Sequence, residues 1–482
     1  MQTIRTVASA AALAAALALA PQADAQNLTR SLLFSSPNHT TVGETVNLTV
    51  QVDGLGGGAP TGAVDFSDNG VALGSATLVT EGAGQTALAA GFDHTCGLTR
   101  NSGARCWGYN GQGELGDGTT RARLAPTIVV GLSTGVTALA TEFFHTCALT
   151  QSGSVKCWGF NDDGQLGDGT TTTSLIPVDV VGLSQGVVAI ATGYNHTCAL
   201  TRIGGVQCWG SNFAGQLGNR STADSSTPVH VFGLGAGVVA LAGGDFYTCA
   251  LTSSGGIKCW GDNTYGQLGD GTDLERHAPR AVEGLTTGVA ALAAGGGHTC
   301  AVTATGGAKC WGDNVNGRLG DGTTVDRHTP VDVVGLTSGV ASVSAGDIST
   351  CALTTAGGVK CWGDNVKGQL GDGTTTNRKT AVDVLGLSAG ISGLAVGGNH
   401  TCALTSGGAL KCWGWNAYGQ LGDGTRTTRL TPTDSKIFSG LVRARAKFTT
   451  SSLVAGMHVL RATYPGDAQH SGSTAVTKQT VK

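Results

Sequence analysis

"HTCALTQSGSVKCWGFNDDGQLGDGTT" extends from His145 to Thr171, and near copies of it recur along the chain. The fourteen cysteines form seven pairs with a spacing of ten residues, and successive pairs are 51 residues apart without drift. Each unit has short stretches of Val, Ala and Leu between Gly, Asp, Asn and Ser, which predicts three or four short strands. Such units arranged around an axis form a β-propeller. Seven copies over residues 84–440 therefore predict seven blades.

The cysteine spacing predicts a disulfide in every blade. Residues 145–150 and 154–159 flank the short loop 151–153, which is typical of a hairpin with glycine in the left-handed conformation. In this register Cys147 faces Cys157 at a separation that a disulfide spans. Free buried thiols are the alternative, and the ligand spacing disfavours zinc. The predicted pairs are Cys96-Cys106, Cys147-Cys157, Cys198-Cys208, Cys249-Cys259, Cys300-Cys310, Cys351-Cys361 and Cys402-Cys412.

The first 25 residues have the pattern of a secretory signal peptide. Arg5 precedes an apolar stretch from Val7 to Ala20, and Ala23-Asp24-Ala25 supplies the small residues of a cleavage site after Ala25. The apolar stretch is too short to span a membrane, and an ordinary N-terminal helix is the alternative. Disulfides persist in oxidising compartments. We therefore expect a secreted, cell-surface or periplasmic protein without a membrane span.

Composition excludes several classes of partner. Only 13% of the residues are charged, the net charge is −3, and no basic stretch could follow a phosphate backbone, so we expect no nucleic acid. Each "GQLGDGT" turn offers one aspartate without clustered carboxylates, which disfavours calcium. No phosphate-binding loop is present. We accordingly expect neither a cofactor nor a metal.

The segments that flank the repeats have a different residue pattern. Residues 44–54 alternate apolar and polar side chains, and residues 62–79 suggest two strands around the turn Asp68-Asn69-Gly70. Together, residues 27–82 and 441–482 total 98, about the size of one immunoglobulin-like sandwich. Because the two ends of a closed ring meet, the propeller can be inserted into one loop of such a domain. Two separate flanking modules are the alternative.

Two resemblances support this organisation. "HTCALT…GVKCWGDN" followed by "GQLGDGT" resembles the repeat of the regulator of chromosome condensation family over about three quarters of the chain. This resemblance implies a seven-bladed propeller and, from the founding activity, nucleotide exchange on a small nuclear GTPase. The flank "PTGAVDFSDNGVALGSATL" resembles a bacterial immunoglobulin-like repeat. The expected fold is an all-β, seven-bladed propeller inserted into an immunoglobulin-like β-sandwich.

The positions at which the repeats differ are the candidate site. A histidine precedes the first cysteine in five repeats, and we interpret these histidines as packing residues at the start of a strand. Two variable segments, before "HTC" and around "WGxN", emerge at the same end of the hairpin. Together with the adjoining Tyr247 they hold eleven of the thirteen Phe and Tyr residues of 84–440 and form an arc over blades one to four and seven. The predicted binding residues are Phe92, Tyr109, Phe143, Phe144, Phe160, Tyr194, Phe213, Phe246, Tyr247, Tyr265, Trp415 and Tyr418.

The arc favours a non-enzymatic propeller that binds a protein, or a glycan, through one face. Loop-anchoring side chains that fold inward are the alternative for each aromatic residue. A propeller enzyme such as a lyase or hydrolase is a second hypothesis, for which Glu142 and Asp245 are the candidate acids. The exchange-factor role of the founding family and a structural role at the cell surface are further alternatives.

Overall fold

The computed structural model describes residues 29–36, 39–54, 60–81, 85–99, 101–435, 442–467 and 470–482; the expected signal peptide lies outside them. The regular elements of this described part are β-strands and one short 3-10 helix, η1 (Val315–Gly317). They divide into two compact units. The larger unit lies between Gly82 and Gly440, and the smaller one combines residues that precede and follow it.

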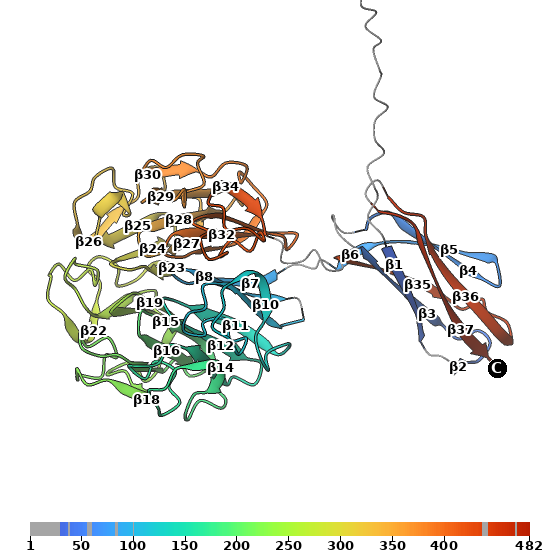
Figure 1. Cartoon of the computed structure of the whole chain (residues 1–482), viewed down its shortest axis with the longest axis horizontal. Coiled ribbons are helices and arrows are strands. Elements are labelled where there is room, and N and C mark those ends of the chain that lie inside the picture. Colours follow the sequence, from blue (N-terminus) through green and yellow to red (C-terminus); the bar gives the residue numbers. More distant parts are fainter. Residues whose placement is uncertain are drawn as a thin grey trace, which may run out of the picture. The chain divides into compact units, whose positions relative to one another are not determined.

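Seven four-stranded antiparallel sheets build the larger unit, one per repeat and in chain order (Figure 1). The first strand of each sheet contacts the first strand of the next, and β31 contacts β7, so the ring closes into a propeller. The blades are, in order, β7 (Gln85–Ala90), β8 (His94–Thr99), β9 (Ala104–Gly108) and β10 (Arg123–Ile128); β11 (Val136–Thr141), β12 (His145–Thr150), β13 (Val155–Gly159) and β14 (Ser174–Asp179); β15 (Val187–Thr192), β16 (His196–Thr201), β17 (Val206–Gly210) and β18 (Ser225–His230); β19 (Val238–Gly243), β20 (Tyr247–Thr252), β21 (Ile257–Gly261) and β22 (Arg276–Ala281); β23 (Val289–Ala294), β24 (His298–Thr303), β25 (Ala308–Gly312) and β26 (Arg327–Asp332); β27 (Val340–Ala345), β28 (Ser349–Thr354), β29 (Val359–Gly363) and β30 (Arg378–Asp383); β31 (Ile391–Val396), β32 (His400–Thr405), β33 (Leu410–Gly414) and β34 (Arg429–Asp434).

All fourteen cysteines form the predicted disulfides, so the free-thiol alternative is wrong. In blade 2, Cys147 and Cys157 are directly opposed on β12 and β13, with their Cα atoms 4.1 Å apart. Gly153 of the connecting turn has a φ of +80°, the left-handed conformation that the loop predicts. Each disulfide thus fixes the central hairpin of its blade.

A repeated set of hydrogen bonds joins each blade to the next. Between blades 1 and 2, the backbone carbonyl of Glu114 accepts hydrogen bonds from the Thr146 hydroxyl at 2.9 Å and from Trp158 Nε1 at 2.8 Å. The Trp158 side chain is fully buried in the core between these blades. The same tryptophan bond occurs at all seven interfaces, including the one from Trp107 to the Gln420 carbonyl that closes the ring. The ring therefore closes through buried polar contacts and apolar packing.

The five recurrent histidines take part in these contacts. His94 Nε2 lies 2.9 Å from the Thr146 hydroxyl, and because that hydroxyl donates to the Glu114 carbonyl, His94 must donate to Thr146. Burial lowers the pKa of His94 and of His145 to about 3, so both rings are neutral near pH 7. Their function is hydrogen bonding across an interface in addition to the expected packing.

Blades 4 and 6 replace this histidine. Tyr247 reaches the equivalent threonine of blade 5 with its hydroxyl, but the direction is reversed: Thr299 Oγ1 donates to the Tyr247 hydroxyl at 3.0 Å, and that hydroxyl donates to the His298 carbonyl. Ser349 is too short, and its buried hydroxyl has no hydrogen-bond partner within the described chain. At that interface Thr401 donates only to the Gln369 carbonyl. The blade 6–7 interface thus lacks one contact of the set.

The aspartates of the "GDGT" turns are engaged within the turn. Asp117 Oδ1 accepts hydrogen bonds from the Thr119 amide and hydroxyl, and Asp117 Oδ2 pairs with Arg123 at 2.6 Å. Burial opposes ionisation of Asp117, but the hydrogen bonds from Thr119 and Arg123 outweigh it and lower its pKa. These aspartates therefore act as turn-stabilising groups.

Two sheets form the smaller unit, and each contains strands from before and after the propeller. One has the order β1 (Thr29–Ser36), β3 (Val46–Gly54), β35 (Val442–Thr450), β6 (Val79–Glu81). The other has the order β2 (His39–Thr40), β37 (Ser473–Val481), β36 (Gly456–Tyr464), β4 (Ala63–Asp68), β5 (Val71–Thr77). The alternating apolar residues of β3 are fully buried in the core that both sheets share, and Asn69 and Gly70 form the expected turn between β4 and β5.

Candidate functional site

The variable segments meet at one end of the propeller. The turn between the first and second strands of each blade carries the residues that precede "HTC", and β12 runs antiparallel to β13, so the "WGxN" loops emerge beside them. Backbone bonds connect these turns around the axis, from the Phe92 amide to the Glu142 carbonyl and from the Tyr194 amide to the Asp245 carbonyl. These bonds hold neighbouring turns, and the side chains they carry, side by side at this end of the propeller.

Nine of the twelve predicted aromatic residues form one connected set of ring contacts, which we call the aromatic array. The Phe143 ring lies at its centre, 4.0 Å from both the Phe92 and the Tyr194 ring centroids. From Tyr194 the array continues to Phe246 at 5.2 Å and from there to Phe213 at 5.0 Å. The nine residues are Phe92, Tyr109, Phe143, Phe144, Phe160, Tyr194, Phe213, Phe246 and Tyr418.

Most members of the array are half-buried, because each ring covers part of its neighbour. Phe213 is the most open member, with 59% of its surface exposed. Stacked and edge-on rings stabilise one another by about 0.5–1.5 kcal/mol per pair beyond the area they bury, so the array is a rigid surface. A rigid apolar surface of this kind suits macromolecular recognition because little conformational entropy is lost on binding.

Three predicted residues lie outside the array. Tyr247 is fully buried, and its assignment to the exposed face is wrong because it occupies the histidine position at a blade interface. Trp415 lies beneath the ammonium group of Lys367, with 4.2 Å between Lys367 Nζ and the ring centroid. Tyr265 is 44% exposed and makes no ring contact within the described residues.

Carboxyl groups lie beside the aromatic array near the axis. Burial, and then the charges of Asp245 and Asp347, raise the pKa of Glu142 well above its usual range. Burial and the Asp347 charge likewise raise the pKa of Asp245 to about 7. A Cβ atom at Gly296 would collide with Asp347 Oδ1 and would lie 3.3 Å from Asp245 Oδ2, so both carboxyl groups flank this glycine. The structure thus brings the two predicted acids, Glu142 and Asp245, into one electrostatic group.

The sequence interpretation missed two members of this group. Asp347 follows a repeat glycine at a position where blades 1–3 carry aromatic rings. Arg318 replaces the Gln of "GQLGDGT" in blade 5, pairs with Asp313 at 2.9 Å and donates to the Asp347 backbone carbonyl. Departures from the repeat are the signal that could have identified both. They line a pocket of about 430 Å³ that can hold a proton or a cationic group near neutral pH.

The described residues contain no group of three or more His, Cys, Asp or Glu side chains arranged to hold a metal ion. In the same part of the chain, no helix is long and apolar enough to cross a membrane.

Known proteins share this fold and these repeats. The family description "RCC1-like domain" matches residues 54–387 and 135–461. The ultraviolet-B receptor UVR8 of Arabidopsis thaliana is 32% identical over 354 residues, covering 72% of this chain and 80% of the relative. Yeast RCC1 (Prp20), solved bound to Kap60, superposes with a TM-score of 0.63 at 21% identity and covers 76% of this chain and 90% of its own. Human WBSCR16 superposes with a TM-score of 0.61 at 22% identity, covering 71% and 100%. The chain therefore belongs to the RCC1-like domain family, as its "HTCALT" and "GQLGDGT" signatures predicted.

Proposed function

We propose that this protein is an exported, non-enzymatic propeller that binds a protein partner through the aromatic array. The observation that carries the proposal is the unbroken set of ring contacts from Tyr418 in blade 7 to Phe213 in blade 3. Aromatic side chains dominate the binding energy of protein interfaces, because they bury large areas and lose little rotamer entropy.

The chemistry of the rim indicates which partner fits. The array adjoins Asp245 and Asp347, so the complementary surface presents apolar groups next to a basic side chain. The raised pKa values of Glu142 and Asp245 follow from their burial and from repulsion by neighbouring carboxylates, and they need no catalytic role. Among the similar proteins, yeast RCC1 was solved bound to Kap60, so a propeller protein of this fold is known with a protein partner.

Export is part of the proposal. Seven disulfides indicate an oxidising compartment, and residues 1–25 have the signal-peptide pattern. This location separates the chain from a nuclear GTPase and disfavours the exchange-factor alternative. We also propose that the smaller unit is an immunoglobulin-like sandwich that hosts the propeller between β6 and β35, since strands from both flanks share its sheets.

Paired variants test the binding face. The intact protein is used to capture and identify a partner from the cell envelope and secretome, and the dissociation constant is then measured with both proteins purified. Phe213→Ala/Phe246→Ala should weaken binding at least tenfold. Ile203→Ala is the matched control, because Ile203 is 75% exposed at the opposite end of the same hairpin. Equal affinities for all three proteins would contradict the proposal.

A further inference from the structure

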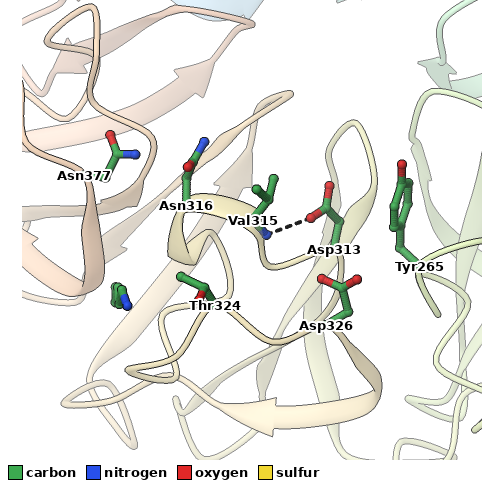
Figure 2. Close-up of a pocket in the computed structure, with 8 residues that line it drawn as sticks. Tyr265, Asp313, Val315, Asn316, Thr324, Asp326 and Asn377 are labelled. Carbon is green, nitrogen blue, oxygen red and sulfur yellow. Dashed lines mark hydrogen bonds between the residues drawn. The ribbon is translucent and has the colours of Figure 1, made fainter.

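A second pocket, of about 730 Å³, lies between the loops of blades 4, 5 and 6 (Figure 2). Its volume is in the range of about 300–1,000 Å³ that is typical of small-molecule sites. Tyr265 stands at one end of the pocket and Asn377 at the other, with η1 between them (Figure 2). Its lining residues are Tyr265, Asp313, Val315, Asn316, Thr324, Asp326, Asn377 and Lys379.

Three polar side chains of this pocket are each held by a hydrogen bond to one of their two polar atoms. Asp326 Oδ1 accepts a hydrogen bond from the backbone N–H of Asn314 at 2.8 Å, and Asn377 Oδ1 accepts the equivalent bond from the backbone N–H of Asn365 at 2.9 Å. Asn316 Nδ2 donates to Asp364 Oδ2 at 2.9 Å. The other polar atom of each side chain, Asp326 Oδ2, Asn377 Nδ2 and Asn316 Oδ1, has no partner within the described chain. The pocket therefore holds two acceptors and one donor in fixed positions.

The backbone at Asn316 also departs from ordinary geometry. Its φ of +64° is left-handed, a conformation that costs a non-glycine residue about 1 kcal/mol or more and that asparagine tolerates better than most residues. This conformation lies within η1, directly before Gly317, where a Cβ atom would approach Lys379 Cα to 2.7 Å. The tight contact between blades 5 and 6 thus places the Asn316 amide at the pocket.

The charges of the pocket nearly cancel. Asp313 is neutralised by Arg318, with 2.9 Å between Asp313 Oδ2 and Arg318 Nη1. Asp326 and Lys379 then bring one negative and one positive charge. This balance disfavours a strongly anionic or cationic ligand.

We propose that this pocket binds a short neutral oligosaccharide. A sugar ring has an apolar C–H face, which packs on an exposed aromatic ring such as Tyr265, and a rim of hydroxyl groups that both donate and accept. Carboxylate and amide groups satisfy such hydroxyls pairwise, which matches the free atoms of Asp326, Asn316 and Asn377. This site goes beyond the proposed protein-binding face, because Tyr265 lies outside the aromatic array.

The test is an array of neutral oligosaccharides that includes chitotriose, cellotriose, maltotriose and xylotriose, followed by calorimetry on any that bind. Tyr265→Ala and Asp326→Asn should each weaken binding at least tenfold, equivalent to about 1.4 kcal/mol. Ile203→Ala is the control, since Ile203 is 75% exposed, does not line the pocket and lies outside the aromatic array. Thermal unfolding of each variant verifies that the propeller is intact.

Three results would overturn the inference. The first is that no neutral oligosaccharide binds at millimolar concentration. The second is binding confined to sulfated or sialylated glycans, and the third is binding that Tyr265→Ala leaves unchanged. Loss of the protein partner in Phe213→Ala/Phe246→Ala is measured in a separate experiment. A negative result for oligosaccharide binding can therefore be told apart from a negative result for the proposed protein-binding face.

Discussion

Replacing Thr146 with valine removes one hydroxyl from the blade 1–2 interface and should cost more stability than the same change at Thr401. The Thr146 hydroxyl donates to the Glu114 carbonyl and accepts from His94 Nε2. Valine has nearly the same shape, so the change leaves a buried imidazole N–H without a partner. Losing a hydrogen bond costs about 0.5–1.5 kcal/mol, and an orphaned buried donor adds about 1–3 kcal/mol. The expected loss is about 2–4 kcal/mol.

Thr401→Val is the internal reference. Its hydroxyl bonds only to the Gln369 carbonyl, because Ser349 does not reach it, so no histidine is orphaned. The expected loss is about 0.5–1.5 kcal/mol. Guanidinium unfolding with the disulfides intact, followed by tryptophan fluorescence, measures both variants because the seven repeat tryptophans lie at blade interfaces. Equal losses, or a larger loss for Thr401→Val, would refute the assigned role of the histidines.

Three further changes test other parts of the structure. Burial lowers the pKa of His400 from 6.5 to about 4, so the stabilising contribution of its neutral ring is complete above pH 6.5 and is lost as the pH falls to 4. Between pH 6.5 and pH 4 the unfolding free energy of His400→Ser should therefore fall by up to about 3 kcal/mol less than that of the parent, and an equal fall would be inconsistent with a buried neutral ring. Burial and the Asp347 charge raise the pKa of Asp245 to about 7, so its carboxylate becomes charged, and destabilising, between pH 4 and 7. Asp245→Asn should therefore raise the melting temperature at pH 8 and leave it unchanged at pH 4, and an effect of the same size at both pH values would argue against the raised pKa. Cys300→Ser/Cys310→Ser should lower the unfolding free energy by about 2–3 kcal/mol, measured against the oxidised parent, and no loss would mean that the hairpin is held without its disulfide.

The propeller was predictable from the sequence because its information is local and repeated. The position of Gly153 and the spacing of Cys147 and Cys157 set the hairpin register, and the structure has that register. The convergence of the aromatic residues followed from strand direction alone. Tyr247 was misassigned because it was grouped with the aromatic residues beside it, although it occupies the repeat position whose histidines the sequence indicates as packing residues.

The two pockets depend on contacts between blades, which a single repeat does not encode. Asp347 reaches Asp245 only because blade 5 has a glycine between them. The proposed oligosaccharide pocket depends on the left-handed conformation of Asn316, which the equivalent residues of the other blades do not share. These features arise from backbone conformation and side-chain length at an interface, and periodicity carries no information about either.

The most direct test of the binding face is site-specific photocrosslinking. Benzoylphenylalanine is placed at position 213, within the aromatic array, or at position 203, at the opposite end of the same hairpin, and the protein is irradiated with its partner. We predict a crosslinked complex from position 213 and none from position 203. Crosslinking from position 203 alone, or equally from both positions, would contradict the assignment of the aromatic array as the binding surface.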